Sequence, residues 1–152
     1  MRKRTILAFA CLSLLFLCLP AYAQKGVSGR WEWTGPLGKD KMKDYLSIDL
    51  KPRAGKVAGT FFYNQLDANG DTESDGGVTA FAGTVSGDTA TIEFDPNAEE
   101  PGYTEHLRYK KPKGKLPSLA TLTFKNGKLV WTQTRGSLGK GIPKQFTMRR
   151  SK

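Results

Sequence analysis

Cysteine and histidine are scarce in this chain of 152 residues, and their scarcity excludes several kinds of site. The two cysteines, Cys11 and Cys18, both lie near the N-terminus, and His106 is the single histidine. A disulfide scaffold and a cysteine-ligated metal site are therefore not expected. One histidine also cannot build a multi-histidine metal centre.

Charge of one sign is missing from two long segments. Residues 57–107 contain no lysine or arginine and ten acidic residues, whereas residues 108–152 contain thirteen basic residues and no acidic one. The segment 24–56 is mixed, with eight basic and four acidic residues. The formal net charge of +10 therefore conceals consecutive blocks of opposite sign.

Residues 1–23 have the pattern of a secretory signal peptide. A basic start precedes an apolar run over 5–19, and an A-x-A cleavage site follows at 21–23. The run is shorter than the ~20 residues that a transmembrane helix needs, and a bulky residue before Cys18 does not fit lipidation. We expect a cleaved leader, a single domain over 24–152, and a secreted protein that is not a lipoprotein, with the periplasm as its expected compartment.

The rest of the chain alternates apolar and polar residues, and helical periodicity is nearly absent. Asn126-Gly127 fits a two-residue type I′ turn, and Ser86-Gly87 fits a second tight hairpin. Short hairpins favour a meander, which closes to remove its edges. We expect an all-β fold, an antiparallel up-and-down meander of eight or nine strands closing into a small barrel. The strands are expected at 29–33, 45–51, 56–63, 77–85, 88–95, 103–110, 118–124, 127–134 and 144–150.

Three segments resemble calycin barrels, the superfamily of the avidins and lipocalins. They are Gly29-x-Trp31 in the first strand, the segment 57–63 with its G-T-aromatic pattern, and the terminal run 141–150. The resemblance implies that Trp31 plugs one end of the barrel and that Arg150 packs over it. The polar residues that hold biotin in avidins have no match at 32–35. The resemblance therefore implies architecture and not biotin binding.

Strand parity then predicts where the charged blocks lie, because successive loops of a meander alternate between the two ends of a barrel. With nine strands, one end carries loops 34–44, 64–76, 96–102 and 125–127, and two of these are strongly acidic. The other end carries loops 52–55, 86–87, 111–117 and 135–143, and three of these are basic. We expect a bipolar barrel with one acidic and one basic end.

A cavity inside the barrel is one candidate site. Several aromatic residues share the inward parity, and Glu105 falls on the same apolar face, where an unpaired carboxylate would be costly. Glu105 either meets a polar partner or ligand, or faces water at a bulge, and small barrels are also often filled by their own side chains. The predicted ligand-binding residues are Trp33, Phe61, Tyr63, Glu105, Tyr109 and Trp131.

Two charged loops are further candidates. The open, lysine-rich stretch after residue 109 suits an anionic polymer, and the residues expected to bind it are Lys110, Lys111, Lys113, Lys115, Arg135 and Lys140. An edge loop kept soluble by lysines has the same composition. Oxygen ligands at alternate positions suit Ca²⁺, but the EF-hand pattern is incomplete, and a solvated polar loop is the favoured alternative. The residues of that loop are Asp67, Asn69, Asp71, Glu73 and Asp75.

No catalytic motif is present, because the chain lacks a G-x-S-x-G elbow and keeps no cysteine after cleavage. No catalytic residue is predicted, and nucleic acid is an unfavoured partner after secretion. The sequence favours a binding module that holds a small apolar or amphipathic ligand in the barrel. The alternative is an interaction protein that binds an anionic envelope polymer or a protein partner through its charged ends.

Overall fold

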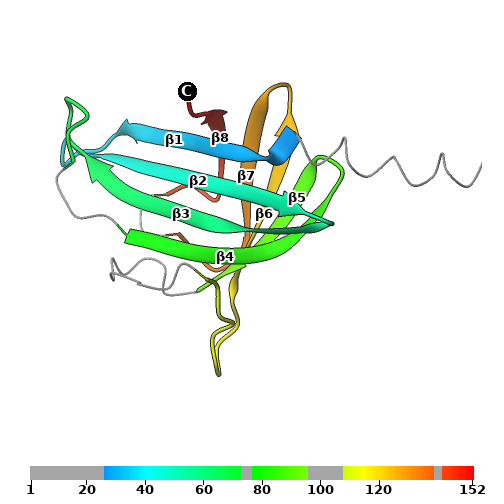
Figure 1. The fold of residues 1–152 in the computed structure, drawn as a ribbon. Coiled ribbons are helices and arrows are strands. Elements are labelled where there is room, and N and C mark those ends of the chain that lie inside the picture. The colour runs from blue at the N-terminus through cyan, green and yellow to red at the C-terminus, as the bar shows by residue number, and fades with distance from the viewer. Residues whose placement is uncertain (1–25, 73–76, 96–107, 139–141) are drawn as a thin grey trace, which may run out of the picture.

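A computed structural model describes residues 26–72, 77–95, 108–138 and 142–152, and its eight strands form one closed antiparallel barrel (Figure 1). Each strand pairs with the next, and β8 returns to pair with β1. The predicted all-β, up-and-down barrel is confirmed. The strands are β1 (Gly29–Leu37), β2 (Lys43–Arg53), β3 (Lys56–Leu66), β4 (Gly77–Ser86), β5 (Thr89–Phe94), β6 (Ser118–Lys125), β7 (Lys128–Arg135) and β8 (Gln145–Arg150).

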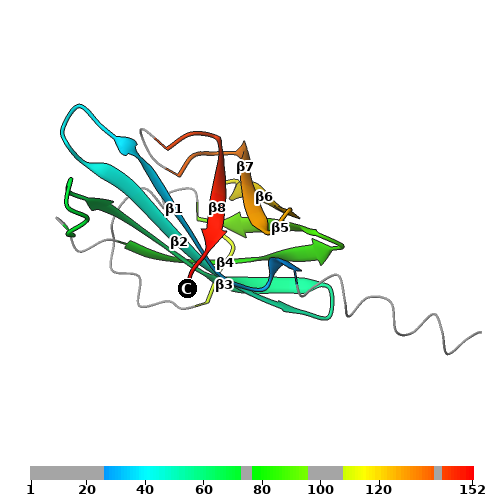
Figure 2. The same ribbon diagram turned by 90° about the horizontal axis from the view of Figure 1, so that it is seen from above.

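The barrel has two ends of different construction (Figure 2). We call one the turn end, because its hairpins close with two-residue turns at 54–55, 87–88 and 126–127. The other is the loop end, where the connections 38–42, 67–76, 95–117 and 136–144 join the strands. The first described residues and the C-terminus also lie at the turn end, since β1 begins there and β8 ends there.

Backbone conformation explains the tight turns. Asn126 and Gly127 have φ values of +52° and +74°, as the predicted type I′ turn requires. Ala54 and Gly55 form a turn of the same kind, with φ values of +49° and +76°. The remaining hairpin differs by one residue from the prediction, because Ser86 still pairs with Thr89.

The predicted ninth strand and the predicted bipolar charge are corrected by this topology. Residues 103–107 lie outside the described residues, 108–110 are not in a strand, and β5 pairs directly with β6. Every loop after the expected strand at 103–110 therefore falls at the end opposite to the one expected. The lysine-rich stretch 110–115 lies at the loop end, together with the acidic loop that follows β3. The predicted division into one acidic and one basic end is wrong.

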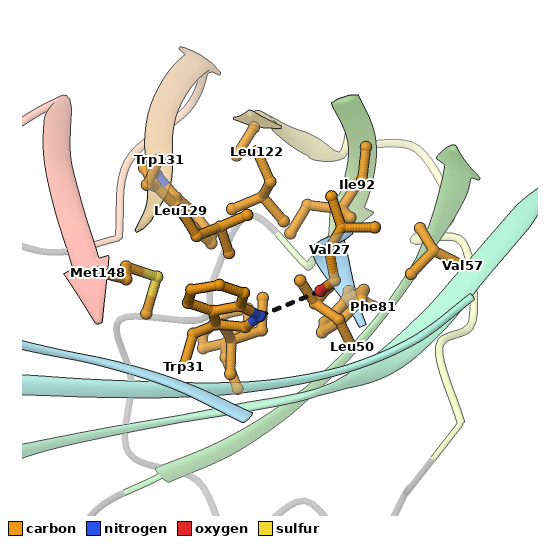
Figure 3. Close-up of a cluster of buried hydrophobic side chains, with 14 of the residues drawn as sticks. Val27, Trp31, Leu50, Val57, Phe81, Ile92, Leu122, Leu129, Trp131 and Met148 are labelled. Carbon is orange, nitrogen blue, oxygen red and sulfur yellow. Dashed lines mark hydrogen bonds between the residues drawn. The ribbon is translucent and has the colours of Figure 1, made fainter. Parts of the chain in front are cut away.

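The interior of the barrel is filled by apolar side chains (Figure 3). Alternate residues of each strand point inward, so Leu46, Ile48 and Leu50 on β2 are all at most 1% exposed. The other largest fully buried side chains come from seven strands: Trp31, Trp131, Phe61, Phe81, Phe94, Ile92, Leu122, Leu129 and Met148. In the described ranges no helix is long and apolar enough to cross a membrane.

Candidate functional site

The turn end is closed by Trp31 and Arg150. The Trp31 indole is fully buried, and its Nε1–H donates to the Val27 carbonyl at 3.0 Å (Figure 3). The Cζ atom of Arg150 lies 4.5 Å from the centre of the indole, which is the contact that the resemblance to calycins implies. The Arg150 guanidinium also donates to the Ser28 and Gly26 carbonyls at 2.8 and 3.1 Å. Ligand entry from this end is therefore blocked.

The loop end is different, because some of the inward-pointing positions of its strands are occupied by polar side chains. On β2 the buried positions Leu46, Ile48 and Leu50 continue to Asp44, and on β3 Tyr63 is followed by Gln65 in the same parity. All three polar side chains are partly buried. The interior thus changes from apolar at the turn end to amphipathic at the loop end.

An aromatic row leads from the core to this end of the barrel. Trp131 and Phe146 stack with ring centres 5.7 Å apart and an interplanar angle of 10°. Phe146 in turn contacts Trp33 at 4.5 Å between ring centres. Gly35 gives the Trp33 indole room, since a Cβ atom at position 35 would lie 3.1 Å from its ring. Trp33 is only partly buried, so the outermost ring of the row is accessible.

A carboxylate with two neighbouring donors lies beside this row. The Tyr63 hydroxyl donates to Asp44 Oδ1 at 2.7 Å, and Gln65 Nε2 approaches the same oxygen at 3.4 Å. Burial and the hydrogen bond to Asp44 raise the pKa of Tyr63 well above its usual range. In the strand register Trp33 and Tyr63 pair with Leu46 from opposite sides. The Trp33 ring on β1 and the hydrogen-bonded Asp44 and Tyr63 on β2 and β3 therefore lie on neighbouring strands. We call this surface the loop-end site, and its residues are Trp33, Asp44, Tyr63, Gln65 and Phe146.

The predicted ligand-binding residues are divided by the structure. Trp33 and Tyr63 belong to the loop-end site, whereas Phe61 and Trp131 are packed in the core with exposures of 1% and 0%. Phe61 and Trp131 contact each other edge to face at 6.2 Å.

The sequence predicted that Tyr109 lines the interior, but the structure places it outside the barrel. Its hydroxyl lies 3.4 Å from Glu93 Oε2, and Glu93 alternates with the buried Ile92 and Phe94, so it points out of the barrel. Burial and the Glu93 carboxylate raise the pKa of Tyr109. The parity argument fails because Tyr109 is not part of a strand. Glu105 lies outside the described residues.

Asp44, Gln65 and Phe146 are residues of this site that the sequence reasoning missed. The signal was present, because the alternation that places Leu46 and Tyr63 inward also places Asp44 and Gln65 inward. The predicted strands at 45–51 and 56–63 end before Asp44 and Gln65, which is why the prediction does not include these two residues. The observed strands begin at Lys43 and end at Leu66.

The described members of the predicted polyanion-binding set all lie at the loop end of the barrel. Lys110, Lys111 and Lys113 are exposed in the connection between β5 and β6. Arg135 instead donates from Nε to the Pro117 carbonyl at 2.7 Å and so holds the start of β6. Lys115 is exposed in the same connection, and Lys140 lies outside the described residues.

The predicted calcium loop is described only in its first half. Asp67 Oδ1 accepts the Asp71 backbone N–H at 2.8 Å, and its Oδ2 accepts from Asn69 at 3.3 Å. The bond from Asp71 is the main cause of a lowered pKa at Asp67. The carboxylate thus closes a turn, and the described residues contain no group of three acidic, histidine or cysteine side chains placed for a metal. Glu73 and Asp75 lie outside the described residues.

Comparisons of the chain with protein-family models, with curated proteins and with solved structures find no match.

Proposed function

We propose that this protein is a secreted binding module that holds a small amphipathic ligand at the loop-end site, and that its barrel is of the calycin type. The observation that supports the proposal most is the Tyr63–Asp44 hydrogen bond beside the accessible Trp33 ring. The Trp31–Arg150 contact supports the calycin kinship.

The chemistry of the site favours a flat apolar group with a hydrogen-bond donor. Trp33 rests against Phe146 and offers the other part of its surface for stacking. Asp44 is a carboxylate and can only accept hydrogen bonds when ionised. Its Oδ1 already accepts from Tyr63, which leaves Oδ2 for a donor on the ligand. A neutral or cationic amphiphile therefore fits better than an anionic one.

Dye binding tests the proposal. The probe is N-phenyl-1-naphthylamine, a neutral aromatic amine. The comparison dye is 1-anilinonaphthalene-8-sulfonate, which has a similar ring system and carries a negative charge. We expect the amine to bind more tightly, Trp33→Ala to weaken it about tenfold or more, and Asp44→Asn to reduce the preference between the two dyes. Each tenfold change corresponds to about 1.4 kcal/mol.

Matched control variants distinguish binding at this site from non-specific dye binding. Asp49→Asn removes a carboxylate on the outer face of β2, where Asp49 pairs with Lys51 at 2.8 Å, and Leu37→Ala removes an exposed apolar side chain at the same end. Both variants should bind the amine as the parent does. Equal binding by Trp33→Ala and the parent protein would show that the ligand site lies elsewhere.

A further inference from the structure

The turn end carries exposed cations that the loop-end site does not use. Arg53 and Lys56 flank the turn between β2 and β3, and Lys125 and Lys128 flank the turn between β6 and β7. All four are exposed, and none makes an ion pair or a side-chain hydrogen bond within the described part of the chain. We call these four residues the turn-end cations.

Backbone hydrogen bonds hold the turns of this end next to one another. The Val85 N–H donates to the Gly55 carbonyl at 2.9 Å, which fixes the first turn against the end of β4. The Phe124 N–H donates to the Asp88 carbonyl at 2.7 Å, which fixes the β4–β5 turn against the end of β6. Figure 1 shows the β2–β3 and β4–β5 hairpin tips on the same side of the barrel. The turn-end cations therefore project from a rigid rim.

Acidic residues at this end are few and mostly neutralised. Asp49 lies 2.8 Å from Lys51, and Glu32 accepts from the Ser151 hydroxyl and lies 3.9 Å from Arg30. Exposed Arg149 and Lys152 add to the positive charge where β8 ends. Of the described turn residues only Asp88 opposes them. The rim has a net positive field that attracts anions over about a Debye length, roughly 10 Å at 0.1 M salt.

The shape and polarity of the rim favour an extended anionic surface. Exposed large hydrophobic side chains in the described ranges are Leu37, Val78 and Leu116, and all three belong to the loop end. The turn end has two-residue turns and so has no long loop, within the described residues, that could fold over a bound polymer chain. Cations on several separate hairpin tips can all contact a flat anionic surface at once, whereas a single polymer chain would reach only some of them.

We propose that the turn-end cations bind the surface of an anionic phospholipid bilayer. The lipid phosphates meet Arg53, Lys56, Lys125 and Lys128, and no side chain inserts into the apolar layer. The loop-end site lies at the opposite end of the barrel, so it faces away from the membrane and stays open to its ligand. This surface and the loop-end site use different residues, and each proposal can fail without the other.

Co-sedimentation with vesicles tests the proposal. The probes are vesicles of equal parts phosphatidylglycerol and phosphatidylcholine, and vesicles of phosphatidylcholine alone. We expect the purified protein to bind only the anionic vesicles at about 0.05 M salt and to be released by about 0.5 M. Replacing all four turn-end cations by glutamine should lower the partition coefficient at least about 100-fold.

A matched variant removes the same charge from the other end. Lys110, Lys111, Lys113 and Lys144 are exposed loop-end residues, and their replacement by glutamine should leave most of the vesicle binding intact. Equal losses in the two quadruple variants would overturn the proposal, because net charge alone would then explain the binding. Failure of the parent protein to bind anionic vesicles overturns it too, and so does binding to heparin resin without binding to vesicles.

Two double variants keep the test valid if the quadruple variant unfolds. Arg53→Gln with Lys56→Gln, and Lys125→Gln with Lys128→Gln, should each lower the partition coefficient about tenfold. Binding of the aromatic amine dye should stay unchanged in both, which shows that the barrel is folded and that the loop-end site is separate. A loss of less than about twofold in both variants contradicts the proposal.

Discussion

Arg150 and Trp31 join the last strand to the first and close the turn end of the barrel. The Cζ atom of Arg150 lies 4.5 Å from the centre of the Trp31 indole, and the two residues also pair in the strand register. The same guanidinium caps the carbonyls of Ser28 and Gly26. One side chain therefore secures the barrel closure and the segment that precedes β1.

Removal of this side chain should destabilise the protein. Arg150→Ala loses a cation–π contact and two charge-assisted hydrogen bonds, and we expect unfolding free energy to fall by about 2–3 kcal/mol. Arg150→Lys should recover only part of this, because an ammonium cannot reach both carbonyls in the same fork geometry. Urea denaturation measures both effects. Arg149→Ala is the control, since exposed Arg149 should change stability by at most about 0.5 kcal/mol.

A left-handed residue in the β2–β3 turn offers a stabilising change. Ala54 has a φ of +49°, a region that costs a residue with a Cβ about 1 kcal/mol and that asparagine tolerates better. Ala54→Asn should raise the unfolding free energy by about 0.5–1 kcal/mol, seen as a higher Tm in calorimetry. Ala68→Asn places the same residue at an exposed position without positive φ. A Tm rise of equal size in both variants would contradict the explanation.

Alkaline pH should destabilise the folded protein in part through Tyr63. The pKa of Tyr63 is raised in the folded protein, so above the ordinary tyrosine pKa of about 10 the unfolded chain releases a proton that the folded chain retains. Stability therefore falls as pH rises beyond that value. Tyr63→Phe is expected to be less stable at pH 7, because Asp44 loses a donor, but to lose less stability between about pH 9 and 11. Parallel pH curves for the two proteins would refute this.

The Asp67 turn should not require calcium. Both carboxylate oxygens of Asp67 accept hydrogen bonds inside the turn, so millimolar calcium should leave the Tm unchanged and Asp67→Ala should lower it in calcium-free buffer. Because the pKa of Asp67 is lowered in the folded protein, its contribution to stability is present above the ordinary aspartate pKa. That contribution is lost on acidification below this value. A clear rise of Tm with calcium would instead support the metal site expected from the sequence.

Period-two alternation was sufficient to predict the barrel, because each strand buries one face. It also placed Trp31, Phe61 and Trp131 inside correctly. The ends of the strands were less predictable. Asp44 and Gln65 are polar residues that continue an inward row, and a pattern based on hydrophobicity ends where such residues begin.

Long-range charge placement was not predictable from the same pattern. A single strand expected at 103–110 reversed the end assigned to every later loop, so the lysines after Tyr109 were placed at the end opposite to the one they occupy. One strand too many in the count moves every later loop to the other end of the barrel. The direct pairing of β5 with β6 places the β6–β7 turn, with Lys125 and Lys128, at the same end as Arg53 and Lys56.

The three tryptophan indoles provide the most direct test of the loop-end site, because each reports on a different level of the barrel. Trp31 lies at the closed turn end, Trp131 lies in the core with its Nε1–H bound to Gln133, and Trp33 lies at the loop end. Their N–H signals can be assigned by single substitution and followed by NMR while N-phenyl-1-naphthylamine is added. We predict a saturable shift of the Trp33 signal while the Trp31 signal stays in place. A shift confined to Trp31, or no saturable shift of Trp33, would contradict ligand binding at this end.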